Sequence, residues 1–119
     1  MDIKHSMGVK AEPVTDPAAK EVKIRWLVGP ESDAPTFHMR HFEIAPGGHT
    51  PQHTHAWEHE CYILEGQGKV VSPEKGTVPV KAGDVIYVRP GEEHQFVNDH
   101  WSKLTFLCMV PKPCEKCKG

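Results

Sequence analysis

Three histidines, His53, His55 and His59, lie two and four residues apart within residues 47–68, a segment that holds four of the nine histidines of this 119-residue chain. On an extended backbone, side chains two or four positions apart point to the same face. Imidazole is a common ligand of divalent transition metals, and clustered imidazoles gain little without a metal because they repel one another when protonated. The spacing therefore predicts a shared metal site.

Short strands are the elements that would position these side chains. Residues 22–28 alternate between apolar and basic side chains, which is typical of a half-buried strand. Pro79, between two valines, indicates an edge strand because proline cannot donate to a ladder. Further strands are predicted, separated by glycine- and proline-rich turns such as residues 46–48, over residues 36–45, 60–65, 69–72, 85–88, 94–98 and 104–110. The whole pattern predicts an all-β sandwich or barrel.

Length and charge limit the classes of protein to consider. A chain of 119 residues is long enough to form one domain with its own core. Its net charge of -2 gives no electrostatic reason to expect nucleic acid or an anionic membrane as partner. No stretch approaches the roughly 20 apolar residues of a membrane span, and the first ten residues lack the apolar region of a signal peptide. We therefore expect a cytoplasmic protein whose cysteines are thiols.

Two segments together resemble the cupin superfamily. Gly47, His53, His55, His59 and Gly66 resemble the first cupin motif in spacing, with His59 where the usual form has glutamate. Residues 83–98, reading G-D-V-I-Y-V-R-P-G-E-E-H-Q-F-V-N, resemble the second motif, with its proline displaced by one position. The string H-T-H-A-W-E-H-E looks like that of the small single-domain cupins whose manganese is held by four histidines.

That resemblance implies an antiparallel jelly-roll β-barrel in a single cupin domain over residues 21–111, between a flexible N-terminal arm (1–20) and a polar tail (112–119). It implies a homodimer and one divalent transition metal per chain, held by His53, His55, His59 and His94. Manganese is the first expectation for the ion and iron the second. Imidazole ligands also suit nickel, zinc and copper, so any of these can replace the native ion during purification.

Glu60 is the competing fourth ligand, since it sits one position after the usual glutamate of the first motif. Strand parity favours His59, because with His55 pointing inward His59 shares its face and Glu60 points away. A β-bulge between them would reverse this parity.

Four neutral ligands leave the charge of the ion uncompensated and two positions of an octahedral shell open. Open positions can accept substrate oxygen atoms or dioxygen, so the first functional expectation is a dioxygenase-type oxygenase acting on a small, partly apolar substrate. A non-catalytic metal- or ligand-binding protein and an oxygen-independent isomerase or lyase are the alternatives. The sequence assigns no catalytic residue.

Parity also indicates side chains that would line the cavity around the ion. Phe96 shares the face of His94, and residues 104–110 place Phe106 and Cys108 on one face. Further candidates for the cavity wall are Trp57, Met39 and His41. His38, Arg40 and His41 could act as acid, base or anion-holding groups, but the pattern favours a surface position for each. Cys114 and Cys117 have the spacing of half a zinc knuckle or a redox pair, or belong to a tail without a site.

Overall fold

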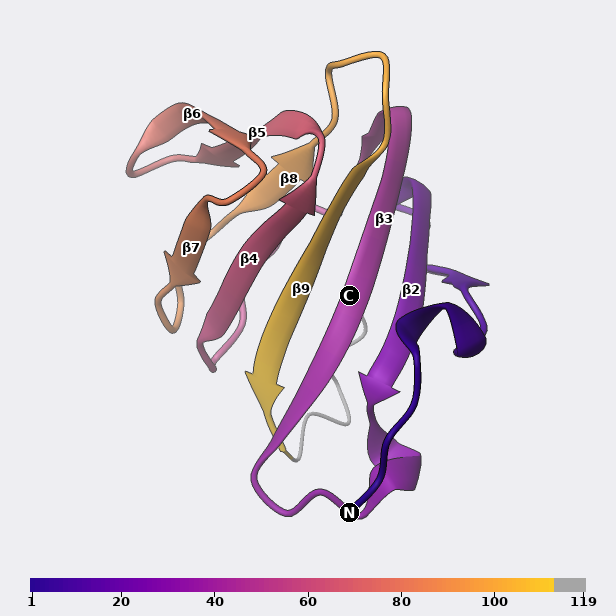
Figure 1. Ribbon diagram of the computed structural model, residues 1–119. Helices are drawn as coiled ribbons and strands as arrows, with labels where there is room; N and C mark the ends of the chain where they lie inside the picture. The colour runs from indigo at the N-terminus through magenta and orange to yellow at the C-terminus, as the bar shows by residue number, and fades with distance from the viewer. Residues whose placement is uncertain (113–119) are drawn as a thin grey trace.

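The computed structural model describes residues 1–112, which form a curled antiparallel β-sheet (Figure 1). The all-β prediction is confirmed. Within the described residues, two short 3-10 helices, η1 (Ser6–Gly8) and η2 (Pro30–Ser32), are the only helices, and neither has the length or apolar character to cross a membrane. The strands are β1 (Glu12–Pro13), β2 (Lys20–Val28), β3 (Phe37–His49), β4 (His59–Glu65), β5 (Gln67–Ser72), β6 (Gly76–Lys81), β7 (Val85–Val88), β8 (Gln95–Val97) and β9 (Leu104–Pro111).

The longest strand, β3, organises the sheet. Its first part pairs with β2 on one side and β9 on the other, and its last residue pairs with β8. The main order is β6-β5-β8-β3-β9-β4-β7, so strands distant in sequence become neighbours. β6 lies at one end of this order, as predicted for the segment that contains Pro79.

Residues 46–48 do not form the turn that their composition predicts. β3 continues through them to His49, and Gly47 adopts a positive φ of 83°, which bends the strand at little steric cost. Beyond the bend, the backbone bonds to β8 and its neighbour, with Gly47 N donating to Asn98 O and Asn98 N donating to Gly48 O, both at 2.9 Å. The glycines thus carry β3 from its pairing with β9 to its pairing with β8.

The core lies inside the curled sheet and follows the predicted alternation. On β9, Leu104, Phe106, Cys108 and Val110 are buried, whereas Leu107 and Met109 on the opposite face are partly exposed; Thr105, also on that opposite face, is buried and departs from the alternation. The Phe106 ring stacks between two other rings, 5.3 Å from Phe42 and 4.5 Å from Phe96 between centroids. This aromatic stack forms the floor beneath the histidine cluster.

The N-terminal residues also contact the sheet. Glu12 pairs with Ile24 in the β1–β2 register, the Arg25 guanidinium donates to the carbonyl of Val9, and Val14 packs against the core. Cys114 and Cys117, with the rest of residues 113–119, lie outside the described residues.

Candidate metal centre

A two-way backbone bridge brings together two histidines from distant parts of the chain. His53, in the loop between β3 and β4, donates its N–H to the carbonyl of His94 at 3.2 Å, and His94 returns a bond to His53 at 3.1 Å. His94 directly precedes β8, so the β3–β8 pairing holds the two residues in register. The second cupin-like segment therefore meets the first at this bridge.

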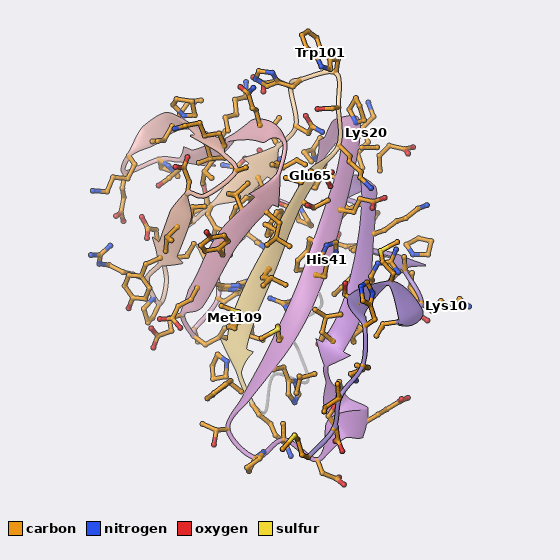
Figure 2. All side chains as sticks on the ribbon, viewed as in Figure 1. Lys10, Lys20, His41, Glu65, Trp101 and Met109 are labelled. Atoms are coloured by element: carbon orange, nitrogen blue, oxygen red, sulfur yellow. The ribbon has the colours of Figure 1, made fainter. Side chains whose placement is uncertain are left out.

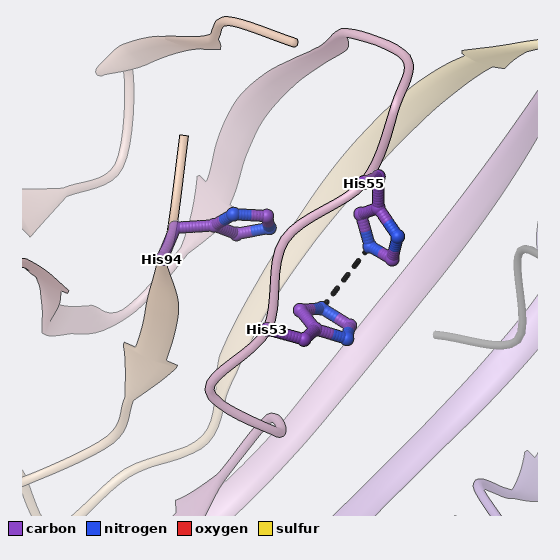
Figure 3. Close-up of side chains that lie close together, drawn as sticks. All are labelled: His53, His55 and His94. Atoms are coloured by element: carbon purple, nitrogen blue, oxygen red, sulfur yellow. Dashed lines mark hydrogen bonds between the residues drawn. The ribbon is translucent and has the colours of Figure 1, made fainter. Parts of the chain in front are cut away.

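His53, His55 and His94 form a cluster in which one ring nitrogen from each lies within 4.8 Å of the others (Figure 3). The Nε2 atoms of His53 and His55 are 3.2 Å apart, and the His94 ring centroid lies 5.1 Å from that of His53 and 5.7 Å from that of His55. Three imidazoles converging in this way could hold a divalent ion.

His59, the first residue of β4, lies beside this cluster. Its ring centroid is 4.7 Å from that of His55 and 5.3 Å from that of His94, and the side chain is buried. Its Nδ1 lies 3.2 Å from Cys108 Sγ, while its Nε2 is buried without a hydrogen-bond partner in the described part of the chain. Since a buried polar atom without a partner is costly, an ion bound at Nε2 would remove this penalty, so the residues present fit a metal.

Glu60 lies on the other face of β4. The strand alternates from buried His59 to exposed Glu60 to buried Cys61. Its register places Glu60 between Tyr87 of β7 and Met109 of β9. No bulge interrupts these pairs between His59 and Ile63.

Substituting the two residues in turn tests the prediction that His59 is the fourth ligand. We expect His59→Ala to weaken metal binding by at least about tenfold, because it removes a ligand, whereas Glu60→Gln should leave the affinity within about twofold. Isothermal titration of the metal-free proteins measures both. Loss of binding in Glu60→Gln together with wild-type binding in His59→Ala would reverse the assignment.

The pKa values of the clustered histidines favour their neutral, metal-binding form. Burial, reinforced by the neighbouring imidazoles, lowers the pKa of His53 to about 4 and that of His55 to about 3. Burial also lowers the pKa of His94, although a hydrogen bond with the Glu92 carbonyl opposes the shift. At neutral pH the nitrogen lone pairs are therefore available for an ion.

Acid is expected to destabilise the metal-free protein before its carboxylates titrate. In the unfolded chain, His53 and His55 become protonated as the pH falls below about 6.5, the ordinary pKa of histidine. In the folded chain they stay neutral until the pH reaches about 4 for His53 and about 3 for His55. The unfolding free energy should therefore be greatest above pH 6.5 and fall as the pH drops from 7 to 5. Urea titrations measure this slope, which His53→Asn/His55→Asn should reduce. An equal slope in the double variant would contradict the prediction.

A small cavity of about 20 Å³ lies next to the histidines, and three of the predicted wall residues line it. Phe96, Phe106 and Cys108 face this cavity together with Arg40, Phe42, Thr50, His53, His59 and His94. Trp57 instead stacks on His55, with 4.7 Å between centroids and 17° between the ring planes. The Trp57 ring therefore packs against the candidate ligand His55 and helps to hold its imidazole in place.

The structure does not bring Met39 and His41 to this cavity. Along β3, burial alternates so that His38, Arg40 and Phe42 point inward. Met39 and His41 lie on the opposite face, and the labelled His41 side chain can be followed on β3 in Figure 2. Period-two alternation thus separates these two residues from the histidine cluster.

The expected surface position of Arg40 and His38 is wrong. Arg40 has no exposed area and His38 is only 4% exposed. The guanidinium Nη2 of Arg40 lies 3.0 Å from Cys108 Sγ and 3.5 Å from His59 Nδ1. Strand parity could have indicated this, because Arg40 lies two and four residues before the apolar side chains of Phe42 and Ile44, which are buried on the same face.

Two buried thiols lie directly opposite each other on β4 and β9. A hydrogen bond donated by Cys61 and the nearby Arg40 guanidinium hold the pKa of Cys108 well below its usual range, against the effect of burial. The same hydrogen bond raises the pKa of Cys61. Cys108 is therefore the more acidic thiol of this pair.

A larger pocket of about 350 Å³ opens on the other side of His94. Its walls come mainly from β5, β6 and β7 and include the apolar side chains of Val70, Val80, Ile86 and Val88. His94 lines both the pocket and the small cavity. A pocket of this size is in the range that holds small-molecule ligands.

Comparison with solved structures shows a similar chain in a polyketide cyclase. The chain aligns with the polyketide cyclase RemF from Streptomyces resistomycificus at 41% sequence identity and a TM-score of 0.89, covering 93% of this chain and 79% of that one. This similarity extends over nearly all of the sheet described above.

Two curated relatives match over shorter regions. The oxalate-binding protein of Thermotoga maritima is 38% identical over 69 residues, which cover 57% of this chain and 56% of that protein. The 1-methylthio-D-xylulose 5-phosphate methylsulfurylase of Rhodospirillum rubrum is 33% identical over 75 residues, which cover 63% of this chain and 47% of that protein. The match thus spans about half the length of each curated relative.

A model of the cupin domain matches residues 40–110, from buried Arg40 to Val110, the next-to-last residue of β9. The matched region contains the histidine cluster, the bridge between His53 and His94, and the aromatic floor. Sequence match and fold agree with the two motifs, and the chain belongs to the cupin family.

Proposed function

We propose that this cupin is a metal-dependent enzyme that acts on a small carbonyl compound without an external oxidant, in a reaction of the cyclase or isomerase type. The observation that carries the proposal is the convergence of nitrogens from His53, His55 and His94 within 4.8 Å, beside a cavity whose described lining contains no carboxylate. When bound there, a divalent ion supplies Lewis acidity to a substrate oxygen. The similarity to a polyketide cyclase supports this class of reaction.

The residues around the cluster have separate tasks in this proposal. His53, His55, His59 and His94 hold the ion as neutral ligands. Phe96 and Phe106 keep bulk water from the inner side of the site, because both are buried and stacked on each other. The 350 Å³ pocket beyond His94 binds the apolar part of the substrate.

An anaerobic assay tests the proposed reaction class. Protein loaded with manganese, iron or zinc is incubated under nitrogen with a linear compound that carries alternating ketones, and the products are separated by chromatography. Metal-dependent formation of a cyclic isomer, or of its dehydrated product, is the expected result. A protein that binds metal but converts none of these compounds, with or without oxygen, would contradict the proposal and favour a binding protein without turnover.

A dioxygenase is the second candidate, and one observation favours it. Three buried aromatic side chains, Phe42, Phe96 and Phe106, form part of the cavity lining, which suits a reaction that must exclude water. Oxygen consumption across β-diketones, catechols and styrene-like alkenes distinguishes this candidate. Uptake of oxygen that depends on both metal and substrate would replace the first proposal with the second.

We propose manganese as the native ion, iron as the second choice and a homodimer as the assembly. Four imidazoles do not discriminate strongly among first-row ions, so the ion must be identified in protein from metal-controlled cultures. Elemental analysis of such protein and light scattering of the purified chain measure both properties. Enrichment of zinc or nickel over manganese and iron, or a monomeric mass, would contradict the corresponding part.

A further inference from the structure

Arg40 is a fully buried cation without an anionic carboxylate partner. It has no exposed area, and in the part of the chain that the structure describes it forms no salt bridge with a carboxylate. An arginine side chain stays charged in proteins, and removing such a charge from water is strongly unfavourable unless other groups compensate. The buried charge of Arg40 therefore lowers the stability of the folded protein.

The contacts of Arg40 satisfy only part of its guanidinium. Nη2 lies 3.0 Å from the sulfur of Cys108, and the group lies over the rings of Phe42 and Trp26 at 5.0 and 5.7 Å from their centroids. Nε and Nη1 are buried and have no hydrogen-bond partner among residues 1–112. Since guanidinium presents five N–H donors in a planar fork, a large part of its donor capacity is left for another molecule.

The unsatisfied guanidinium lies on the wall of the cavity beside the histidines. Arg40, His53, His59 and His94 line this cavity, which has about 20 Å³, enough for one oxygen atom of a larger molecule. Neutral histidine ligands would not offset the positive charge of a bound ion. A divalent ion and Arg40 would together create a strongly positive interior beside this cavity.

We propose that Arg40 is a substrate-positioning residue that receives one anionic oxygen, of a carboxylate or an enolate, in the cavity between Arg40 and the histidines. This inference rests on the proposed function in one respect: the same substrate would also contact the metal ion held by the histidines. The site thereby selects small molecules that carry or develop negative charge on oxygen over neutral alcohols and amides. Arginine suits the task because its planar N–H fork matches the geometry of a carboxylate.

The Arg40→Met variant separates this role from a structural one. It replaces the charge with an apolar chain of similar length and is compared with Arg25→Met, which removes a guanidinium from β2 that bonds to the Val9 carbonyl outside the cavity lining. Binding of acetate, a carboxylate probe, and of ionised acetylacetone, an enolate probe, is titrated at constant ionic strength. Acetamide serves as the neutral analogue of acetate. Metal-free and metal-loaded proteins are both measured, and no turnover is required.

We expect wild type and Arg25→Met to bind at least one of the two anions, and Arg40→Met to bind that anion at least tenfold more weakly. None of the proteins should prefer acetamide over acetate. Which anion binds tells a carboxylate substrate from an enolate substrate. We also expect the urea midpoint of ligand-free Arg40→Met to be no lower than that of wild type, because a buried charge whose N–H donors are only partly satisfied has been removed. Binding in metal-free protein would persist if the proposed catalysis failed.

Two results would overturn the inference. One is equal affinity for the anions in wild type and in folded Arg40→Met, or no anion binding in either. The other is a lower urea midpoint in ligand-free Arg40→Met, which would mean that the guanidinium is kept for the fold. An Arg40→Lys variant separates the effect of the fork from that of the charge, because it retains the charge but loses the fork. Wild-type affinity in Arg40→Lys would equally contradict recognition by the guanidinium.

Discussion

His94→Ala is expected to reduce the affinity for a divalent metal by more than about 100-fold, because loss of a ligand should exceed the 10- to 100-fold effect of removing a group that only orients one. The imidazole of His94 lies within the cluster that also contains His53 and His55. The substitution leaves the backbone bridge between His53 and residue 94 in place, since both bonds join main-chain atoms.

Metal content after dialysis and isothermal titration measure this effect. His100→Ala is the matched control, because it removes an exposed imidazole from the loop between β8 and β9. We expect His100→Ala to retain the wild-type metal content. A His94→Ala protein that also retains it would mean that the ion is bound elsewhere.

Phe106→Ala is expected to have the largest effect on stability, lowering the unfolding free energy by about 3–5 kcal/mol. The ring is 2% exposed and is stacked between Phe42 and Phe96, so its removal leaves a cavity that the two rings cannot both fill. Since domains of this size are stable by only about 5–15 kcal/mol, the variant should be close to unfolding at body temperature.

Urea denaturation followed by tryptophan fluorescence measures the change, with Trp101→Ala as the control. Trp101 is 90% exposed and extends from the loop between β8 and β9, as Figure 2 shows. Its removal should change the free energy by no more than about 0.5 kcal/mol. A loss below about 1 kcal/mol in Phe106→Ala would show that the aromatic floor repacks and does not fix the site.

Strand alternation was sufficient to predict much of the fold. The buried face of β9 and the edge position of the segment around Pro79 follow from local rules of side-chain direction and hydrogen bonding. The turn expected at residues 46–48 was wrong because Gly47 and Gly48 have the composition of a turn but bond to Asn98 and so continue β3. Local composition cannot reveal that partner, since it lies in another part of the chain.

The candidate site was predictable to a similar degree. The spacing of His53 and His55 pointed to a metal, whereas His94 entered only through the resemblance to a family, because its bridge to His53 is a long-range contact. Arg40 was missed although its parity was visible, because a charged residue on a strand is most often at the surface. The same parity places Met39 and His41 on the opposite face of β3, away from the cavity wall that was predicted for them.

The bridge between His53 and His94 also affects how the protein unfolds. An ion bound across it would act as a non-covalent cross-link that closes the long loop of chain between the two residues. Because the bridge adjoins the single β3–β8 pair of His49 and Val97, separation of β8 from β3 would pull one ligand away from the others. The rate at which the protein loses its ion would then measure local opening at this corner, before the β3–β9 ladder separates.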